Sequence, residues 1–231
     1  MFKLKKEFFE IRERDSPMNS FKLSAAALIV SGSAFADFNG ASMTVESAVS
    51  GYDTYKIFLN FTSPADKLLA INGDVSGGYS AISYEGGELY NVAAFGVLGD
   101  DTGTYQGTAP GMEGDSYVTI GGQSDTQFSP GFLAGNADAL GQVIRGSSFT
   151  WEDNGGYFDS DPGSGAFDSG SGILIAQLTV ASGEDVTFGG TASFNSDTGD
   201  LSFGEFSVTT VPAPGALALI GLAGLGRRRR G

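Results

Sequence analysis

Short runs of alternating apolar and polar residues, separated by glycine, aspartate, asparagine or serine, constrain the fold of this chain most. In residues 52–62, four apolar or aromatic side chains fall on one face with a period of two: Tyr55, Ile57, Leu59 and Phe61. In residues 173–180 (ILIAQLTV), the even-numbered side chains are all apolar and the odd-numbered ones are half apolar. Such a strand is expected to be covered on both faces. Both patterns predict β-strands with a buried face.

Further runs rich in β-branched or aromatic residues predict more strands, at 42–49, 67–72, 79–84, 88–97, 116–120, 186–194 and 201–210. Only residues 130–143 offer room for a short helix after the N-terminal segment. We therefore expect an all-β fold, a single antiparallel β-sandwich or jelly-roll-like domain over residues 37–206. A parallel β-solenoid is the rival architecture, but no fixed-period repeat supports it. Leu59, Phe61, Leu178 and Val180 are predicted core residues.

The charge and the missing residue types exclude several functions. Residues 37–211 contain 23 Asp and Glu but three basic residues, Lys56, Lys67 and Arg145, for a net charge of −20. Such a surface repels nucleic acid, so we expect no nucleic-acid partner. The chain has no histidine and no cysteine, which removes Ser-His-Asp and Cys-His catalysis and the usual zinc ligands. A glycosidase built on two carboxylates is the remaining enzymatic alternative, and we expect no enzyme activity.

The N-terminal region reads as an export signal. A basic start after Met18 is followed by apolar residues 23–30, and Ala34 and Ala36 supply the small residues that signal peptidase accepts. Cleavage is predicted between Ala36 and Asp37, with residues 1–36 outside the folded domain. The mixed charges before Met18 fit no signal peptide, so Met18 is the expected true start. An amphipathic extension over residues 3–14 is the alternative.

The C-terminal region, residues 207–231, reads as a tether followed by a membrane signal. A Pro212-Ala213-Pro214 hinge leads into the uncharged residues 213–226, for which we expect a short transmembrane helix, and four arginines follow, Arg227, Arg228, Arg229 and Arg230. The uncharged stretch is shorter than the roughly 20 residues that cross a bilayer comfortably. The arginines act as a positive-inside stop. An ordinary C-terminal anchor is the plain alternative to a processed signal.

This order of proline pair, Gly215, short apolar helix and arginine cluster resembles the PEP-CTERM sorting signal of Gram-negative and related bacteria. Ala213 stands where that family usually has glutamate. Residues 52–61, 66–74, 115–121 and 176–179 are also similar to segments of uncharacterised PEP-CTERM proteins of planctomycetes. The resemblance implies processing by a membrane exosortase, a place at the cell envelope, surface or extracellular matrix, and an association with exopolysaccharide and biofilm. It implies no catalytic residue.

Residues 151–172 contain the highest density of Gly, Ser and Asp, and they predict a long surface loop. Four of its carboxylates are candidate Ca²⁺ ligands: Asp153, Asp159, Asp161 and Asp168. A solvated acidic loop without a metal is the interpretation we favour over a bound Ca²⁺, and no other cofactor is expected. Trp151, Tyr157 and Phe158 are candidate sugar-stacking residues, although such rings more often anchor loops to a core.

These features lead to two hypotheses. The first is an exported, non-enzymatic cell-surface or matrix protein that signal peptidase and an exosortase process. The second is a carbohydrate-binding module, assisted by calcium or not, with its site in residues 151–172. A planar strip of exposed aromatic rings would favour the second hypothesis.

Overall fold

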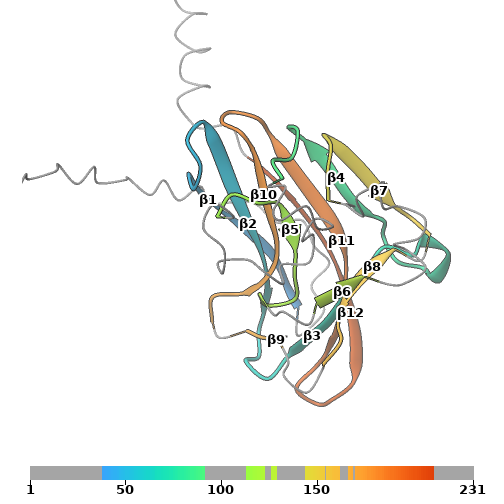
Figure 1. Ribbon diagram of the computed structural model, residues 1–231. Helices are drawn as coiled ribbons and strands as arrows, with labels where there is room; N and C mark the ends of the chain where they lie inside the picture. The colour runs from blue at the N-terminus through green and yellow to red at the C-terminus, as the bar shows by residue number, and fades with distance from the viewer. Residues whose placement is uncertain are drawn as a thin grey trace, which may run out of the picture.

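The computed structural model describes residues 38–91, 113–122, 126–128, 144–153, 155–161, 166–168 and 170–210. Within these ranges the chain forms twelve strands and one 3₁₀ turn (Figure 1). The first half contains β1 (Phe38–Glu46), β2 (Tyr52–Phe61), β3 (Lys67–Asn72), η1 (Val75–Gly77), β4 (Ile82–Gly86), β5 (Tyr117–Val118) and β6 (Thr126–Phe128). The second half contains β7 (Ser148–Trp151), β8 (Gly156–Asp159), β9 (Ala166–Phe167), β10 (Ile173–Ala181), β11 (Val186–Asn195) and β12 (Leu201–Thr209).

The smaller of two antiparallel sheets has four strands in the order β1-β2-β10-β5. Strand β2 lies in its interior, and Leu59 pairs with Ala41 of β1 on one side and with Ile173 of β10 on the other. Strand β10 is buried from Ile175 to Val180, so the prediction that both of its faces are covered is confirmed.

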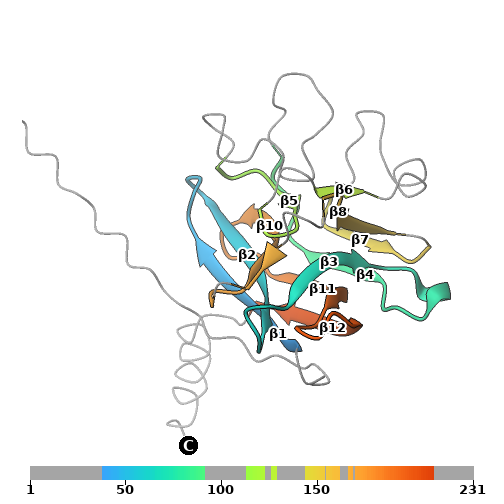
Figure 2. The ribbon, with the colours of Figure 1, turned by 90° about the horizontal axis from the view of Figure 1, so that it is seen from below.

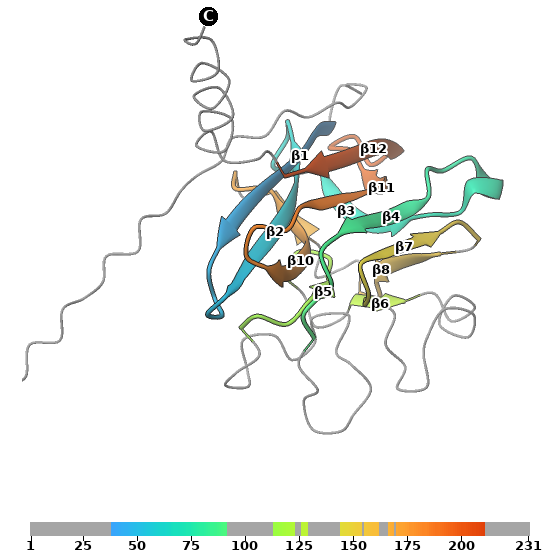
Figure 3. The same cartoon turned by 90° about the horizontal axis from the view of Figure 1, so that it is seen from above.

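The larger sheet has the order β6-β8-β3-β11-β4-β7, with β12 paired to β11 and β9 paired to β3. Strand β11 lies in the interior of this sheet and pairs with three other strands. It pairs along its whole length with β12, and its other edge is divided between β4, near Val186, and β3, near Asn195. Figure 2 and Figure 3 show the small sheet on one side of the molecule and β4, β6, β7 and β8 on the other, with β11 between them.

Residues from both sheets bury their apolar faces in one core. At one end of it, Phe38 of β1 and Phe61 of β2 pack against Phe194 of β11, with ring centroids 6.0 and 5.0 Å from the Phe194 ring. The predicted core residues Leu59, Phe61, Leu178 and Val180 are all buried. Large aromatic side chains therefore supply much of this core, and the chain contains no cysteine that could cross-link it.

The all-β, antiparallel character of the fold is confirmed, and several details of the sequence prediction are wrong. Residues 151–172 are not one long surface loop, because they include β8, β9 and several buried side chains. The strand predicted at 79–84 begins at Ile82, and residues 88–91 of the strand predicted at 88–97 lie outside any strand. Strands β6 to β9 were not predicted.

The predicted signal helix, the transmembrane helix at 213–226 and the short helix at 130–143 lie outside the described residues. In the part of the chain that the structure describes, the one helical element is the 3₁₀ turn η1, which Asp74 caps. No helix within that part is long and apolar enough to cross a membrane.

Candidate functional site

Asp168, one of the four candidate calcium ligands, instead accepts backbone hydrogen bonds from separate segments of the chain. It follows β9 directly and is buried. Its Oδ2 accepts the N–H of Phe61 at 3.0 Å, and its Oδ1 accepts those of Gly170 at 2.7 Å and Gly172 at 2.9 Å. Burial alone raises the pKa of this carboxyl, but the backbone hydrogen bonds from Phe61, Gly170, Gly172 and Ser171 together outweigh it and lower the pKa. The carboxylate is therefore satisfied by backbone amides.

The other three carboxylates do not gather around Asp168. Asp159 is buried in β8, and its Oδ1 accepts the backbone N–H of Asp161 at 2.8 Å. The side chains of Asp153 and Asp161 are exposed. Among the described residues, no group of three or more acidic side chains is arranged to hold a metal ion. The described residues therefore do not form the calcium site considered from these four carboxylates, of which only Asp159 lies in a strand.

Two of the three predicted sugar-stacking rings, those of Trp151 and Tyr157, face the core. Trp151 is 4% exposed and stacks on Phe149, with ring centroids 4.3 Å apart and planes 11° apart. Tyr157 is fully buried, and its hydroxyl donates to the carbonyl of Ile175 in the opposite sheet at 3.1 Å. Neither ring can lie against a sugar, so this prediction is wrong for both residues, and the alternative that such rings anchor their segment to the core describes them.

Other aromatic rings lie on the outer face of the larger sheet. Phe203 pairs with Ser193, Ser193 with Ala70, and Ala70 with Phe158, so these residues form one row across four strands. In the next row, Leu201 pairs with Asn195, Asn195 with Lys67, and Lys67 with Phe167. Phe167 is 49% exposed and Leu201 58%, while Phe158 and Phe203 are half-buried. We call this surface the outer aromatic face.

Contacts within the outer aromatic face fix some of these rings. The Lys67 ammonium lies 5.5 Å from the centroid of the Phe167 ring, and Tyr79 contacts Phe203 with centroids 5.2 Å apart. Asn72 donates to the hydroxyl of Ser193 between the rings. The face therefore combines apolar rings with a polar floor.

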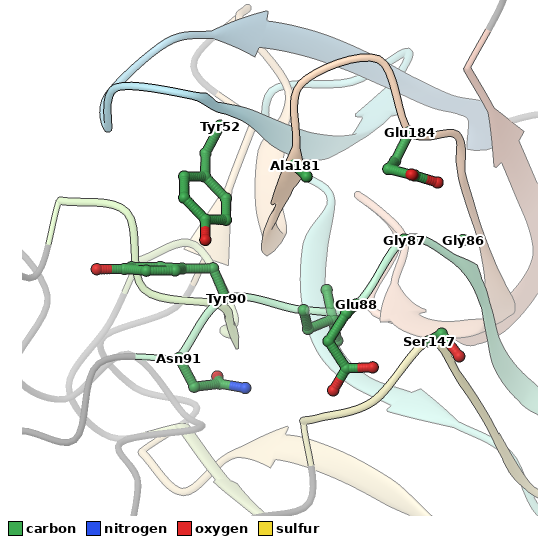
Figure 4. Close-up of a pocket in the computed structure, with 10 residues that line it drawn as sticks. Tyr52, Gly86, Gly87, Glu88, Tyr90, Asn91, Ser147, Ala181 and Glu184 are labelled. Carbon is green, nitrogen blue, oxygen red and sulfur yellow. The ribbon is translucent and has the colours of Figure 1, made fainter.

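A separate pocket of about 520 Å³ opens where the two sheets meet. It is lined by Tyr52, Gly86, Gly87, Glu88, Leu89, Tyr90, Asn91, Ser147, Ala181 and Glu184. Figure 4 shows the rings of Tyr52 and Tyr90 on one side, Glu184 and Ser147 on the other, and Glu88 between them. The two rings lie 4.7 Å apart with planes inclined by 53°. We call this the tyrosine–glutamate pocket.

The sequence did not predict the tyrosine–glutamate pocket, because its residues come from four separate segments of the chain. The one local signal is the Gly86-Gly87 pair that precedes Glu88. A Cβ on Gly86 would lie 2.2 Å from the carbonyl oxygen of Asp185, and one on Gly87 would lie 2.7 Å from the Cβ of Glu184. Both glycines are thus required for the close approach of this segment to the β10–β11 turn.

The predicted processing residues lie outside the described residues. These are Ala34 and Ala36 at the signal peptidase site and Pro212, Pro214, Gly215 and Arg227, Arg228, Arg229 and Arg230 in the sorting signal.

No protein-family model, curated protein or solved structure matches this chain. The fold and the two surfaces described above are therefore the basis for any functional assignment, together with the sequence signals at the two ends.

Proposed function

We propose that this chain is an exported, non-enzymatic protein of the bacterial cell surface or extracellular matrix, with a jelly-roll-like β-sandwich as its folded part. The observation that carries the proposal is the C-terminal order of proline pair, short uncharged stretch and four arginines. A 14-residue helix would be about 21 Å long, against a hydrocarbon core of about 30 Å. Such a segment suits a transient enzyme substrate better than a lasting anchor.

The positions at which the first strand begins and the last strand ends support this proposal. Strand β1 begins at Phe38, directly after the proposed cleavage between Ala36 and Asp37, and β12 ends at Thr209, just before Pro212. Phe38 is buried and packs against Phe61 and Phe194. The contacts among the described strands therefore do not depend on residues 1–36 or on the tail.

The test is mass spectrometry of both termini of surface-extracted protein, from bacterial strains with and without the exosortase. We expect an N-terminus at Asp37 and loss of residues 215–231 only where the exosortase is present. A variant with all four arginines replaced by glutamine should keep its tail, whereas Lys67→Gln, which removes a cation from the folded domain, should be processed normally. If residues 215–231 remain attached in both strains, the chain carries an ordinary anchor and the sorting proposal fails.

Carbohydrate binding is the second candidate function, and the outer aromatic face is the observation that favours it. Sugar rings have apolar faces and polar edges, so a polysaccharide chain lying across the strands would meet both Phe158 and Phe203 and the polar floor around Ser193 and Asn195. A neutral or cationic polysaccharide fits best, because the folded region is strongly acidic. Of the three rings first considered for sugar stacking, Phe158 belongs to this face, whereas Trp151 and Tyr157 are buried in the core.

Binding of purified residues 37–211 to a polysaccharide panel tests this second function. The Phe158→Ala/Phe203→Ala double variant should lose binding. Phe58→Ala is the matched control, because Phe58 is a half-buried phenylalanine of β2 in the other sheet. Equal loss in the control and the double variant would mean that general destabilisation, and not the outer aromatic face, accounts for the effect.

A further inference from the structure

We propose that the tyrosine–glutamate pocket binds a primary ammonium group carried on a small organic body, of about the size of one sugar ring. An amino sugar and a free aliphatic diamine share this chemistry. The inference does not rest on the outer aromatic face, which is formed by different strands, or on the sorting signal. It depends on three features of the pocket: its charge, its aromatic wall and its fixed backbone.

The two carboxylates that line the pocket, those of Glu88 and Glu184, both influence the hydroxyl of Tyr84. Tyr84 lies just behind the pocket, is 2% exposed, and donates its hydroxyl to the carbonyl of Gly87. Burial raises the pKa of Tyr84 well above its usual value, and the negative charges of Glu88 and then Glu184 raise it further. Both carboxylates therefore lie within electrostatic reach of one buried hydroxyl, and both belong to residues that line the pocket, so each would attract a cation bound there.

No basic residue is among the described residues that line the pocket. The charged side chains that line it are those of Glu88 and Glu184. An anionic ligand would thus face repulsion from these two carboxylates and from the strongly acidic folded region. A metal ion fits less well than an organic cation, because no described group of three or more acidic side chains is arranged to coordinate one.

The aromatic wall suits the organic body of such a ligand. The rings of Tyr52 and Tyr90 are half-buried and inclined to each other, so they form a corner and not a flat stacking surface. An ammonium group or the carbon atoms beside it gain from contact with tyrosine faces. Ser147, on the opposite side, and Asn91, next to Tyr90, offer hydrogen bonds to polar groups on the ligand (Figure 4).

The pocket is built on a fixed backbone, so little ordering is needed when a ligand binds. Segment 86–90 is hydrogen-bonded to its neighbours on both sides. Gly86 donates to Ser147 at 2.9 Å and Leu89 to Gly146 at 3.1 Å, while Gly87 donates to Asp185 at 3.0 Å and Tyr90 to Thr179 at 2.8 Å. These bonds connect the segment to the residues just before β7 on one side, and to β10 and the β10–β11 turn on the other.

Isothermal titration of purified residues 37–211 with glucosamine, N-acetylglucosamine and putrescine tests the proposal. Glucosamine and N-acetylglucosamine have the same ring, but only glucosamine carries an ammonium group. We expect binding of glucosamine and no binding of N-acetylglucosamine. Binding of putrescine as well would identify the ammonium group alone as the recognised feature, and its failure to bind would identify an amino sugar.

Variants separate this site from a general effect of negative charge. Glu88→Gln/Glu184→Gln should weaken glucosamine binding by about tenfold, since two partly exposed charge pairs are lost. Glu152→Gln/Asp153→Asn removes the same charge from exposed residues outside the pocket and should leave binding unchanged. The proposal is overturned if glucosamine does not bind, if N-acetylglucosamine binds equally well, or if both double variants weaken binding to the same extent. Circular dichroism of each variant verifies that it is folded.

Discussion

The carboxylate of Asp168 accepts the backbone N–H of Phe61 at 3.0 Å, although the two residues lie 107 positions apart in the sequence. This contact connects the last residue of β2 to the segment between β9 and β10. The same carboxylate binds Gly170 and Gly172, so it also shapes the turn that starts β10. Because β2 and β10 are neighbours in the small sheet, Asp168 fixes one end of their pairing.

Replacement of Asp168 should reveal this role. In Asp168→Asn, an amide nitrogen takes the place of an oxygen that accepts backbone N–H groups, so one or more buried donors lose their partner. We expect a loss of about 1–3 kcal/mol in the free energy of unfolding at pH 7. Asp153→Asn, at an exposed position, should change stability little. Urea denaturation measures both, and equal stability of the two variants would contradict the assignment.

The pH dependence of this effect has a definite sign. The pKa of Asp168 is lower in the folded than in the unfolded state, where it is about 3.9. Its stabilising contribution is therefore fully present above about pH 4 and is lost as the pH falls through the folded-state value. The stability difference between wild type and Asp168→Asn should shrink below about pH 4. A difference that stays constant down to pH 2 would show that the charge of Asp168 is not responsible.

Leu178 tests the shared core. It is fully buried in β10, whereas Leu174 in the same strand is half-buried. Leu178→Ala should cost roughly 2–5 kcal/mol in unfolding free energy, because it removes apolar contacts and leaves a cavity. Leu174→Ala should cost clearly less. Chemical denaturation followed by tryptophan fluorescence measures both, since Trp151 is buried in the same core. Equal losses would mean that burial in β10 does not follow the described register.

Tyr157 should make the fold sensitive to alkaline pH. Burial raises the pKa of Tyr157 well above its usual value of about 10, so the folded state keeps its phenol neutral. Stability from this group is complete below about pH 10 and is lost as the pH rises further, when the unfolded state ionises first. Tyr157→Phe loses the hydrogen bond to Ile175 at neutral pH but should show a shallower fall in melting temperature between pH 9 and 11. Parallel curves for the two proteins would refute this explanation.

The acidic balance predicts a response to salt. With a net charge of −20 on residues 37–211, self-repulsion opposes folding, and added ions screen it. The melting temperature should therefore rise with NaCl. Since the four predicted calcium ligands lie apart, CaCl₂ and MgCl₂ at matched ionic strength should act alike. A larger rise with CaCl₂ would point to a calcium site outside the described residues.

The long strands could be predicted from the sequence because their pattern is local. In β2 and β12 the alternation of side chains specifies which face is buried, whatever the partner strand is. In β10 both alternating sets are mostly apolar, which predicts a strand covered on both faces. Strands β7, β8 and β9 are short and flanked by Gly, Ser and Asp, so their own residues resemble a loop. Pairing with β3 and β4 makes them strands, and the tertiary fold supplies those partners.

The two ends of the chain show what the sequence determines by itself. Export and sorting signals are read as linear patterns, so the proposed signals at Ala36 and at Pro212 to Arg230 need no fold to be recognised. The candidate sites depend on the fold. In the sequence Asp168 is a plausible metal ligand, but in the fold its carboxylate accepts the N–H of Phe61, which lies 107 positions away. The tyrosine–glutamate pocket joins Tyr52, Glu88 and Glu184, residues far apart in the sequence, because strand pairing alone decides which of many acidic and aromatic residues become neighbours.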